Sequence, residues 1–121
     1  MANTFKVVTF AAEPHSAGTP YVVYTAGSGV TAVVLGLILT NINTAQVTAE
    51  VELVSDTGSR GGSNDVTNGT AFLAKDIPIP VGSSVELLSG NKVVLETTDQ
   101  IRIDCSVADK LSGALSVMEI T

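Results

Sequence analysis

The stretch TAVVLGLILTN at Thr31 to Asn41 decides the class of fold, because it is the most apolar part of the sequence. The apolar run within it, Val30 to Leu39, is about half as long as a membrane-spanning helix requires. Its branched side chains and the central Gly36 favour a strand over a helix. We therefore expect a buried β-strand here.

Alternation along this strand places apolar side chains on both of its faces. One face is expected to carry Val33, Leu35, Leu37 and Leu39. The other is expected to carry Val34, Gly36 and Ile38. In a small two-layer domain one face packs on the core, so the second face needs a long loop or a neighbouring subunit to cover it. We take Val34 and Ile38 as a candidate oligomer interface.

Short segments of alternating polarity, separated by turn residues, continue on both sides of this strand. Further strands are expected at Phe5 to Phe10, Tyr21 to Thr25, Gln46 to Asp56, Phe72 to Pro80, Ser84 to Leu88, Lys92 to Leu95, Gln100 to Val107 and Ala114 to Thr121. About eight to nine short strands predict an all-β protein, an antiparallel β-sandwich of the jelly-roll or Ig-like type. Residues 1–121 are expected to form a single domain.

Local signals add expectations about how these segments are arranged. The Asn-rich NINTA segment at Asn41 to Ala45 suits a hairpin loop, which would pair Gln46 to Asp56 with the preceding strand. Pro78 and Pro80 remove backbone donors and predict an edge strand. We also expect an extended N-terminal arm over residues 1–20 and a mobile loop over residues 55–70.

Charge and composition argue against several classes of partner. Twelve acidic and six basic residues give a net charge of −6, which repels phosphate backbones and anionic lipid surfaces. We expect neither a nucleic acid nor a membrane as partner. The sequence lacks Trp and has few aromatic residues of any kind, which disfavours sugar-binding surfaces. The start of the sequence shows no secretion signal, so synthesis in the cytoplasm is expected.

The residues that usually carry catalysis are scarce. The single His15 lies in a Pro- and Gly-containing segment, where a solvated side chain is expected. The single Cys105 alternates with Ile101 and Ile103, which predicts a buried and inert thiol. We expect no enzyme activity, no catalytic residues and no cofactor.

One loop offers oxygen ligands to a hard cation such as Ca²⁺. These side chains are Asp56, Ser63, Asn64, Asp65 and Asn68. Their spacing matches no EF-hand, and Gly and Asx residues also gather in ordinary loops for conformational reasons. We therefore assign no metal site and leave cation binding by this loop open.

Two longer segments carry a resemblance to a known group of proteins. They read LILTNINTAQVTAEVELVSD from Leu37 to Asp56 and IPIPVGSSVELLSGNKVVLETTDQIRIDCS from Ile77 to Ser106, and the chain closes with SVMEIT. This order of strands and turns resembles small virion proteins of tailed bacteriophages, over about two-thirds of the chain. The pattern contains no catalytic signature and transfers no site residues.

The resemblance implies a β-sandwich in the virion, most specifically a capsid decoration or cement protein. Such a protein would stabilise the head as a homo-oligomer, which we expect to be a trimer bound to the major capsid protein or to other virion proteins. A tail, neck, baseplate or fibre component is the first alternative. A carbohydrate-binding jelly-roll module is the second, and it would require exposed aromatic residues or calcium.

Overall fold

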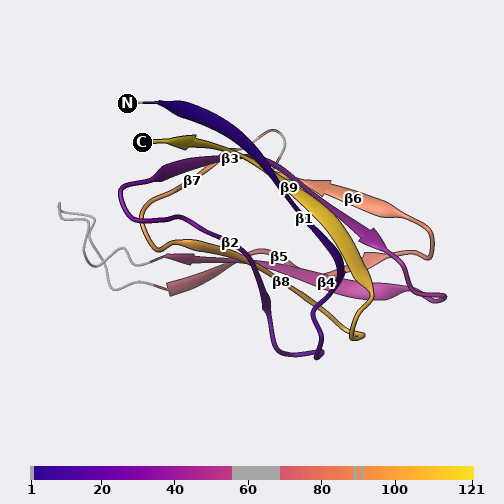
Figure 1. Cartoon of the computed structure of the whole chain (residues 1–121). Helices are drawn as coiled ribbons and strands as arrows, with labels where there is room; N and C mark the ends of the chain where they lie inside the picture. The colour runs from indigo at the N-terminus through magenta and orange to yellow at the C-terminus, as the bar shows by residue number, and fades with distance from the viewer. Residues whose placement is uncertain (1, 56–68, 89, 91) are drawn as a thin grey trace.

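The computed structural model is all-β and describes residues 2–55, 69–88, 90 and 92–121. Its nine strands are β1 (Asn3–Glu13), β2 (Tyr21–Thr25), β3 (Thr31–Asn41), β4 (Val47–Ser55), β5 (Gly69–Ile79), β6 (Ser84–Leu87), β7 (Val93–Leu95), β8 (Gln100–Cys105) and β9 (Leu111–Ile120). They form two antiparallel sheets that face each other (Figure 1). The predicted β-sandwich is therefore confirmed.

The strand order identifies the sandwich as a jelly roll. The first sheet runs β1-β9-β3-β6, with β7 also pairing β3, and the second runs β2-β8-β4-β5. Strands pair as nested hairpins, β4 with β5, β3 with β6 and β7, β2 with β8, and β1 with β9. The nested hairpins form one long antiparallel ribbon. When this ribbon rolls up, β9 also pairs with β3 and β8 with β4. This nested pairing is the jelly-roll alternative rather than the Ig-like one.

The strand after Asn41 crosses to the opposite sheet instead of turning back in a hairpin. The predicted pairing of β4 with β3 is wrong, because β3 lies in the first sheet and β4 in the second. Asn41 fixes this crossing: its Nδ2 donates to the carbonyl oxygens of Ala45 at 3.0 Å and Ile79 at 2.9 Å. Its Oδ1 accepts from the backbone N–H of Asn43 at 2.7 Å. The predicted edge position of the Pro-containing strand is confirmed, since β5 ends the second sheet.

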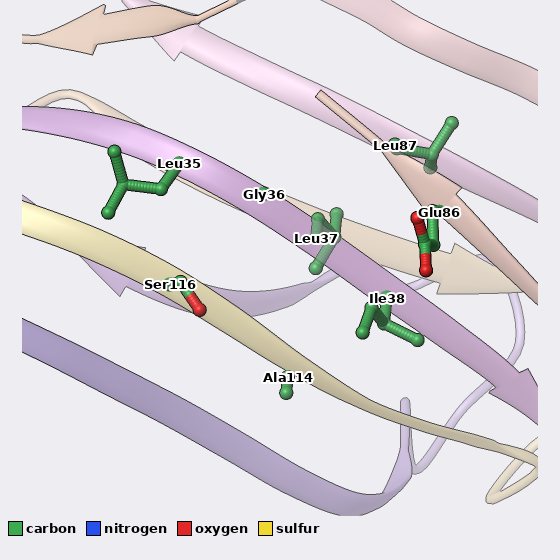
Figure 2. A pocket seen from close by; sticks show the side chains of 8 residues that line it. All are labelled: Leu35, Gly36, Leu37, Ile38, Glu86, Leu87, Ala114 and Ser116. Atoms are coloured by element: carbon green, nitrogen blue, oxygen red, sulfur yellow. The ribbon is translucent and has the colours of Figure 1, made fainter. Parts of the chain in front are cut away.

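A β-bulge changes which side chains of β3 face the core. The register of β3 against β9 shifts between Val34 and Gly36, so Leu35 is the extra residue. Side chains before the shift are buried at even positions and those after it at odd positions, as Val34, Leu37 and Leu39 show. Figure 2 shows this part of β3 from close by.

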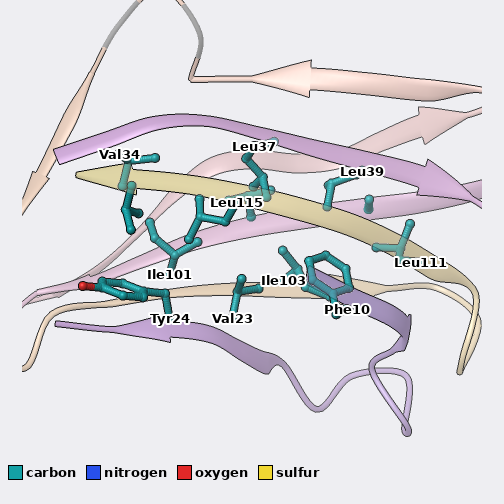
Figure 3. Packing of buried hydrophobic residues seen from close by; sticks show 14 of the residues in the cluster. Phe10, Val23, Tyr24, Val34, Leu37, Leu39, Ile101, Ile103, Leu111 and Leu115 are labelled. Carbon is teal, nitrogen blue, oxygen red and sulfur yellow. The ribbon is translucent and has the colours of Figure 1, made fainter. Parts of the chain in front are cut away.

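The core lies between the two sheets and is almost entirely aliphatic. Its largest fully buried side chains include Leu37, Leu39, Leu95, Leu111 and Leu115 from the first sheet and Val47, Val51, Ile79, Ile101 and Ile103 from the second. Figure 3 shows β3 and β9 facing β2 and β8 across core side chains such as Leu37, Leu115 and Ile103, with Phe10 at one end and Tyr24 at the other. Burial on this scale supplies the main stabilising free energy of the fold.

The N-terminal segment is part of the first sheet over most of its length. Residues 3–10 of the predicted arm pair continuously with β9, from Asn3 opposite Ile120 to Phe10 opposite Gly113. The pairing extends to the two ends of the chain, because Ala2 and Thr121 exchange backbone N–H to O bonds of 3.3 and 3.0 Å. The predicted mobile loop at 55–70 lies, apart from its ends in β4 and β5, outside the described residues.

Candidate interaction surface

The outer face of the first sheet carries a row of apolar side chains that crosses four strands. The register places Phe5 of β1 opposite Met118 of β9, Met118 opposite Val33 of β3, and Val33 opposite Val94 of β7. Phe5 is 71% exposed and Val94 56% exposed. Val7, which is 65% exposed, begins the neighbouring row. We call this outer face, as defined by these residues together with Ile38, the apolar face.

Charge is nearly absent from the apolar face. Small and uncharged residues fill its remaining positions in the register, among them Thr9, Ser112, Ala114, Ser116 and Thr40. Among the outward strand positions that the structure describes in this sheet, only Glu86 is ionisable; it lies on β6 opposite Ile38. An apolar, uncharged sheet surface exposed to water is a typical feature of a protein-protein contact.

The outer face of the second sheet is charged instead. Its central row joins Val22, Arg102, Glu52 and Phe72 across four strands. Lys75 donates to Glu50 at 2.7 Å, and this bond raises the pKa of the lysine. Its ammonium group also lies 4.5 Å from the centre of the Phe72 ring. Glu52 is only 7% exposed within this charged row. The two sides of the sandwich therefore differ in chemistry.

A groove of about 400 Å³ opens on the apolar face beside Gly36. It exists because β6 pairs with Leu37 to Thr40 and β7 with Ala32 to Val34, so neither of these two strands covers Leu35 and Gly36 on that edge. Its lining is mostly apolar: Leu35, Gly36, Leu37, Ile38, Leu87 and Ala114, with Ser116 and Glu86 (Figure 2). A Cβ atom added to Gly36 would meet nothing within 4 Å. The missing side chain at Gly36 thus leaves part of the groove open.

The two residues predicted to form an interface do not share a face. Val34 is fully buried in the core, whereas Ile38 is 42% exposed on the apolar face. The prediction of a common face is wrong because the bulge at Leu35 reverses the alternation between them. Ile38 remains a candidate interface residue, and Val34 supports the sheet from inside.

The sequence pattern did not predict four residues of the apolar face: Phe5, Val7, Val94 and Met118. Their outward orientation depends on the register of four strands, which are far apart in the sequence. The alternation of Phe5, Lys6 and Val7 in β1 indicates that the two apolar side chains share one face opposite the lysine. On its own this pattern favours an apolar face turned to the core, so it does not predict the outward orientation.

A polar cluster holds the exposed half of β1 against the rest of the sandwich. Glu119 of β9 accepts the hydroxyl hydrogen of Tyr24 from the opposite sheet, and Lys6 of β1 lies 3.0 Å from the same carboxylate. The hydrogen bond from Tyr24 and, second to it, the bond from Lys6 lower the pKa of Glu119. Burial first and the carboxylate second raise the pKa of Tyr24. Lys6 thereby turns inward while its neighbours Phe5 and Val7 point outward.

The two side chains best suited to acid-base or nucleophilic chemistry, His15 and Cys105, lie in separate places. His15 is exposed; its Nδ1 lies 2.7 Å from Asp109 and its Nε2 3.5 Å from Glu13. The hydrogen bond to Asp109 raises the pKa of the imidazole. Cys105 is only 3% exposed at the end of β8, and burial raises the pKa of its thiol, which disfavours the reactive thiolate.

Acidic groups gather in a second hollow, of about 190 Å³, which includes Glu50, Asp76 and Asp104 in its lining. Asp104 accepts the backbone N–H groups of Cys105 at 2.8 Å and Gly18 at 3.2 Å, and Glu50 holds Lys75. Within the described ranges, no group of three or more His, Cys, Asp or Glu residues is placed to hold a metal ion. The loop side chains for which cation binding was left open, from Asp56 to Asn68, lie outside the described residues.

Comparisons with known proteins agree on the fold. No protein-family model matches the chain, and no curated protein matches it by sequence. Among solved structures, a chain from the T13 particle of infectious bursal disease virus superposes with a TM-score of 0.50 at 14% identity, covering 96% of this chain and 31% of its own. A VP2 subviral particle of the same virus gives 0.49 at 15% identity, covering 96% and 32%. A Bacillus endospore appendage protein, from disulfide-linked pili, gives 0.46 at 16% identity, covering 99% and 87%.

The likeness to the T13-particle chain, at a TM-score of 0.50, shows a shared β-sandwich fold and nothing further. The identities are low, and this chain spans about a third of the length of the viral chains. The proteins compared build particles or pili, and that statement concerns them alone. In the part of the chain that the structure describes, no helix is long and apolar enough to span a membrane.

Proposed function

We propose that this chain is a non-enzymatic structural protein of a virus particle, specifically a decoration or cement protein of a tailed-phage head. One observation carries the proposal: the apolar face is exposed over four strands and holds a single ionisable outward residue, Glu86, among the described strand positions. A surface of this chemistry is stabilised when another protein covers it. In this role the chain acts as a homotrimer that bridges subunits of the major capsid protein.

Two further observations support a virion role. The jelly-roll fold is shared with a chain of an icosahedral virus particle, at a TM-score of 0.50. The segments at Leu37 to Asp56 and Ile77 to Ser106 resemble small phage virion proteins. They contain β4, β6, β7 and β8 in full and only the ends of β3 and β5. A tail, neck or fibre component would use the same fold and differs in copy number.

Quantitative mass spectrometry of purified particles of the source phage tests the proposal. Labelled peptide standards give the ratio of this chain to the major capsid protein. A ratio near one, or a fixed large fraction of it, is expected for a protein bound across the head. A handful of copies would overturn the decoration role and favour the tail or neck. Absence from particles would overturn the virion role altogether.

A further inference from the structure

We infer that neighbouring copies of this chain associate through the apolar face, with Phe5 of one copy seated in the groove beside Gly36 of the next. This inference rests on the proposed homo-oligomer and specifies its contact. Phe5 is the most exposed large apolar side chain among the described residues. An exposed aromatic ring that fills an apolar pocket is the usual centre of a protein-protein contact.

Charge favours a second copy of the same chain as the occupant. With a net charge of −6, two copies repel each other unless they meet where acidic groups are absent. The outer face of the second sheet holds Glu50 and Glu52, whereas the apolar face holds only Glu86 among its described strand positions. The apolar face is therefore the sheet surface on which like-charged copies can meet.

The size of the apolar face is sufficient for a closed ring of copies. Four strand positions about 4.8 Å apart, crossed by the eight residues Asn3 to Phe10 at about 3.3 Å each, span roughly 500 Å². In a ring each copy divides this face between two neighbours, so one contact buries roughly 500 Å² and a closed trimer about 1,500 Å² in all, which reaches the range of stable interfaces only when the ring closes. A contact of this size depends strongly on its central residues, which is why Phe5 and the groove can be tested singly.

Phe5 and the groove lie on opposite sides of the apolar face. Phe5 is on the edge strand β1, whereas the groove lies where β3 meets β6. A projection and a matching recess at separate places allow each copy to contact the next one, and such contacts can close into a ring. The groove, at about 400 Å³, falls in the size range of pockets that hold whole small molecules, so a phenyl ring fits.

Two substitutions test the two halves of the contact separately. Phe5→Ser removes the ring from an exposed position. Gly36→Val adds a side chain that suits a strand and whose Cβ meets open space in the groove. The matched control is Phe72→Ser, because Phe72 is 50% exposed on the opposite sheet. Circular dichroism and thermal denaturation establish that each variant keeps the fold.

Light scattering on the purified protein across a concentration series supplies the readout. We expect wild type and Phe72→Ser to form the same oligomer, near three times the 12.4 kDa chain mass. Phe5→Ser and Gly36→Val should each raise the dissociation constant about tenfold or more. A monomeric wild type at micromolar concentration, or an oligomer that neither substitution weakens, would overturn the inference.

Mixing the two variants separates a specific contact from general loss of apolar surface. Phe5→Ser keeps an intact groove and Gly36→Val keeps an intact Phe5, so the mixture restores one contact per pair of molecules. We expect a heterodimer on mixing at concentrations where each variant alone is monomeric; no heterodimer would contradict the seating of Phe5. The copy number in particles is independent of these results, so the proposed function and this contact can fail separately.

Discussion

Phe10 lies directly over Gly113, and a Cβ atom added to Gly113 would come within 2.5 Å of the Phe10 ring. The same atom would come even closer to the backbone carbonyl oxygen of Ile38. The two residues are register partners on β1 and β9, and Phe10 is only 6% exposed. The absence of a side chain at Gly113 is thus what allows the ring to close this end of the core.

Replacing Gly113 with Ala should therefore destabilise the protein. Because backbone and a buried ring must both shift, we expect a loss of about 1–3 kcal/mol in the free energy of unfolding. Denaturant unfolding at low protein concentration measures it. Gly36→Ala is the matched strand control, since its Cβ meets open space, and it should change stability by less than about 0.5 kcal/mol. Equal effects at the two sites would contradict the packing argument.

Val34→Asp and Ile38→Asp should differ strongly in their cost to the stability of the fold. Val34 is fully buried, so a carboxylate there lacks solvent and should cost more than about 3 kcal/mol, or prevent folding. In Ile38→Asp the new carboxylate stays on the surface, and its one charged neighbour across the strands is Glu86. Repulsion between these two carboxylates should cost about 0.2–1 kcal/mol of stability. Circular dichroism should show β structure for Ile38→Asp alone, with weakened association by light scattering. A folded Val34→Asp variant would contradict the bulge-defined register.

Tyr24→Phe should remove the hydrogen bond between the sheets and leave the Glu119 carboxylate with Lys6 as its charged partner. We expect a loss of about 1 kcal/mol near neutral pH. Because the folded state lowers the pKa of Glu119, its contribution is present above the unfolded value of about 4.3 and is lost as pH falls through the folded pKa. The difference between variant and wild type should therefore shrink in acid. A difference that stays constant down to pH 3 would contradict the assignment.

His15 should titrate above its ordinary value of 6.5, because Asp109 and then Glu13 favour its protonated form. A raised folded pKa means that any stabilisation is present below about 6.5 and is lost as pH rises through the folded value. Since the chain has a single histidine, one NMR titration of the imidazole protons measures it. Asp109→Asn should lower the midpoint more than Glu13→Gln. Two equal midpoints for wild type and Asp109→Asn would exclude the contact in solution.

The sequence predicted the strands well because turn residues mark their ends. The expected bounds of Tyr21–Thr25 and Thr31–Asn41 match β2 and β3 in full, and the strand ending at Pro80 lies at a sheet edge as expected. Apolar alternation reports which residues are buried and carries little information on which strand pairs with which. For that reason the partner of β4 was predicted incorrectly after Asn41.

The interaction surface was harder to predict from the sequence than the strands were. A single bulge residue, Leu35, separates the faces of Val34 and Ile38. The adjacent Gly36, an isolated glycine within a strand, was the one sign of a bulge in the sequence, and it does not say which residue is the extra one. Phe5 and Val94 lie in one row because β9 and β3 stand between their strands in the sheet. Their common row therefore follows from the strand pairing and cannot be seen in the sequence. Ile38 was identified because its own alternation happened to give the correct side.

The pairing of Ala2 with Thr121 has a mechanical consequence. Because these residues meet at the same end of the β1–β9 ladder, pulling them apart would load its hydrogen bonds one after another instead of all together. The nested order of the hairpins then lets β1 and β9 peel away before β2 and β8 carry load. A tether attached at these two positions would open the sandwich at low force, whereas a load spread over the apolar face would press the sheets together.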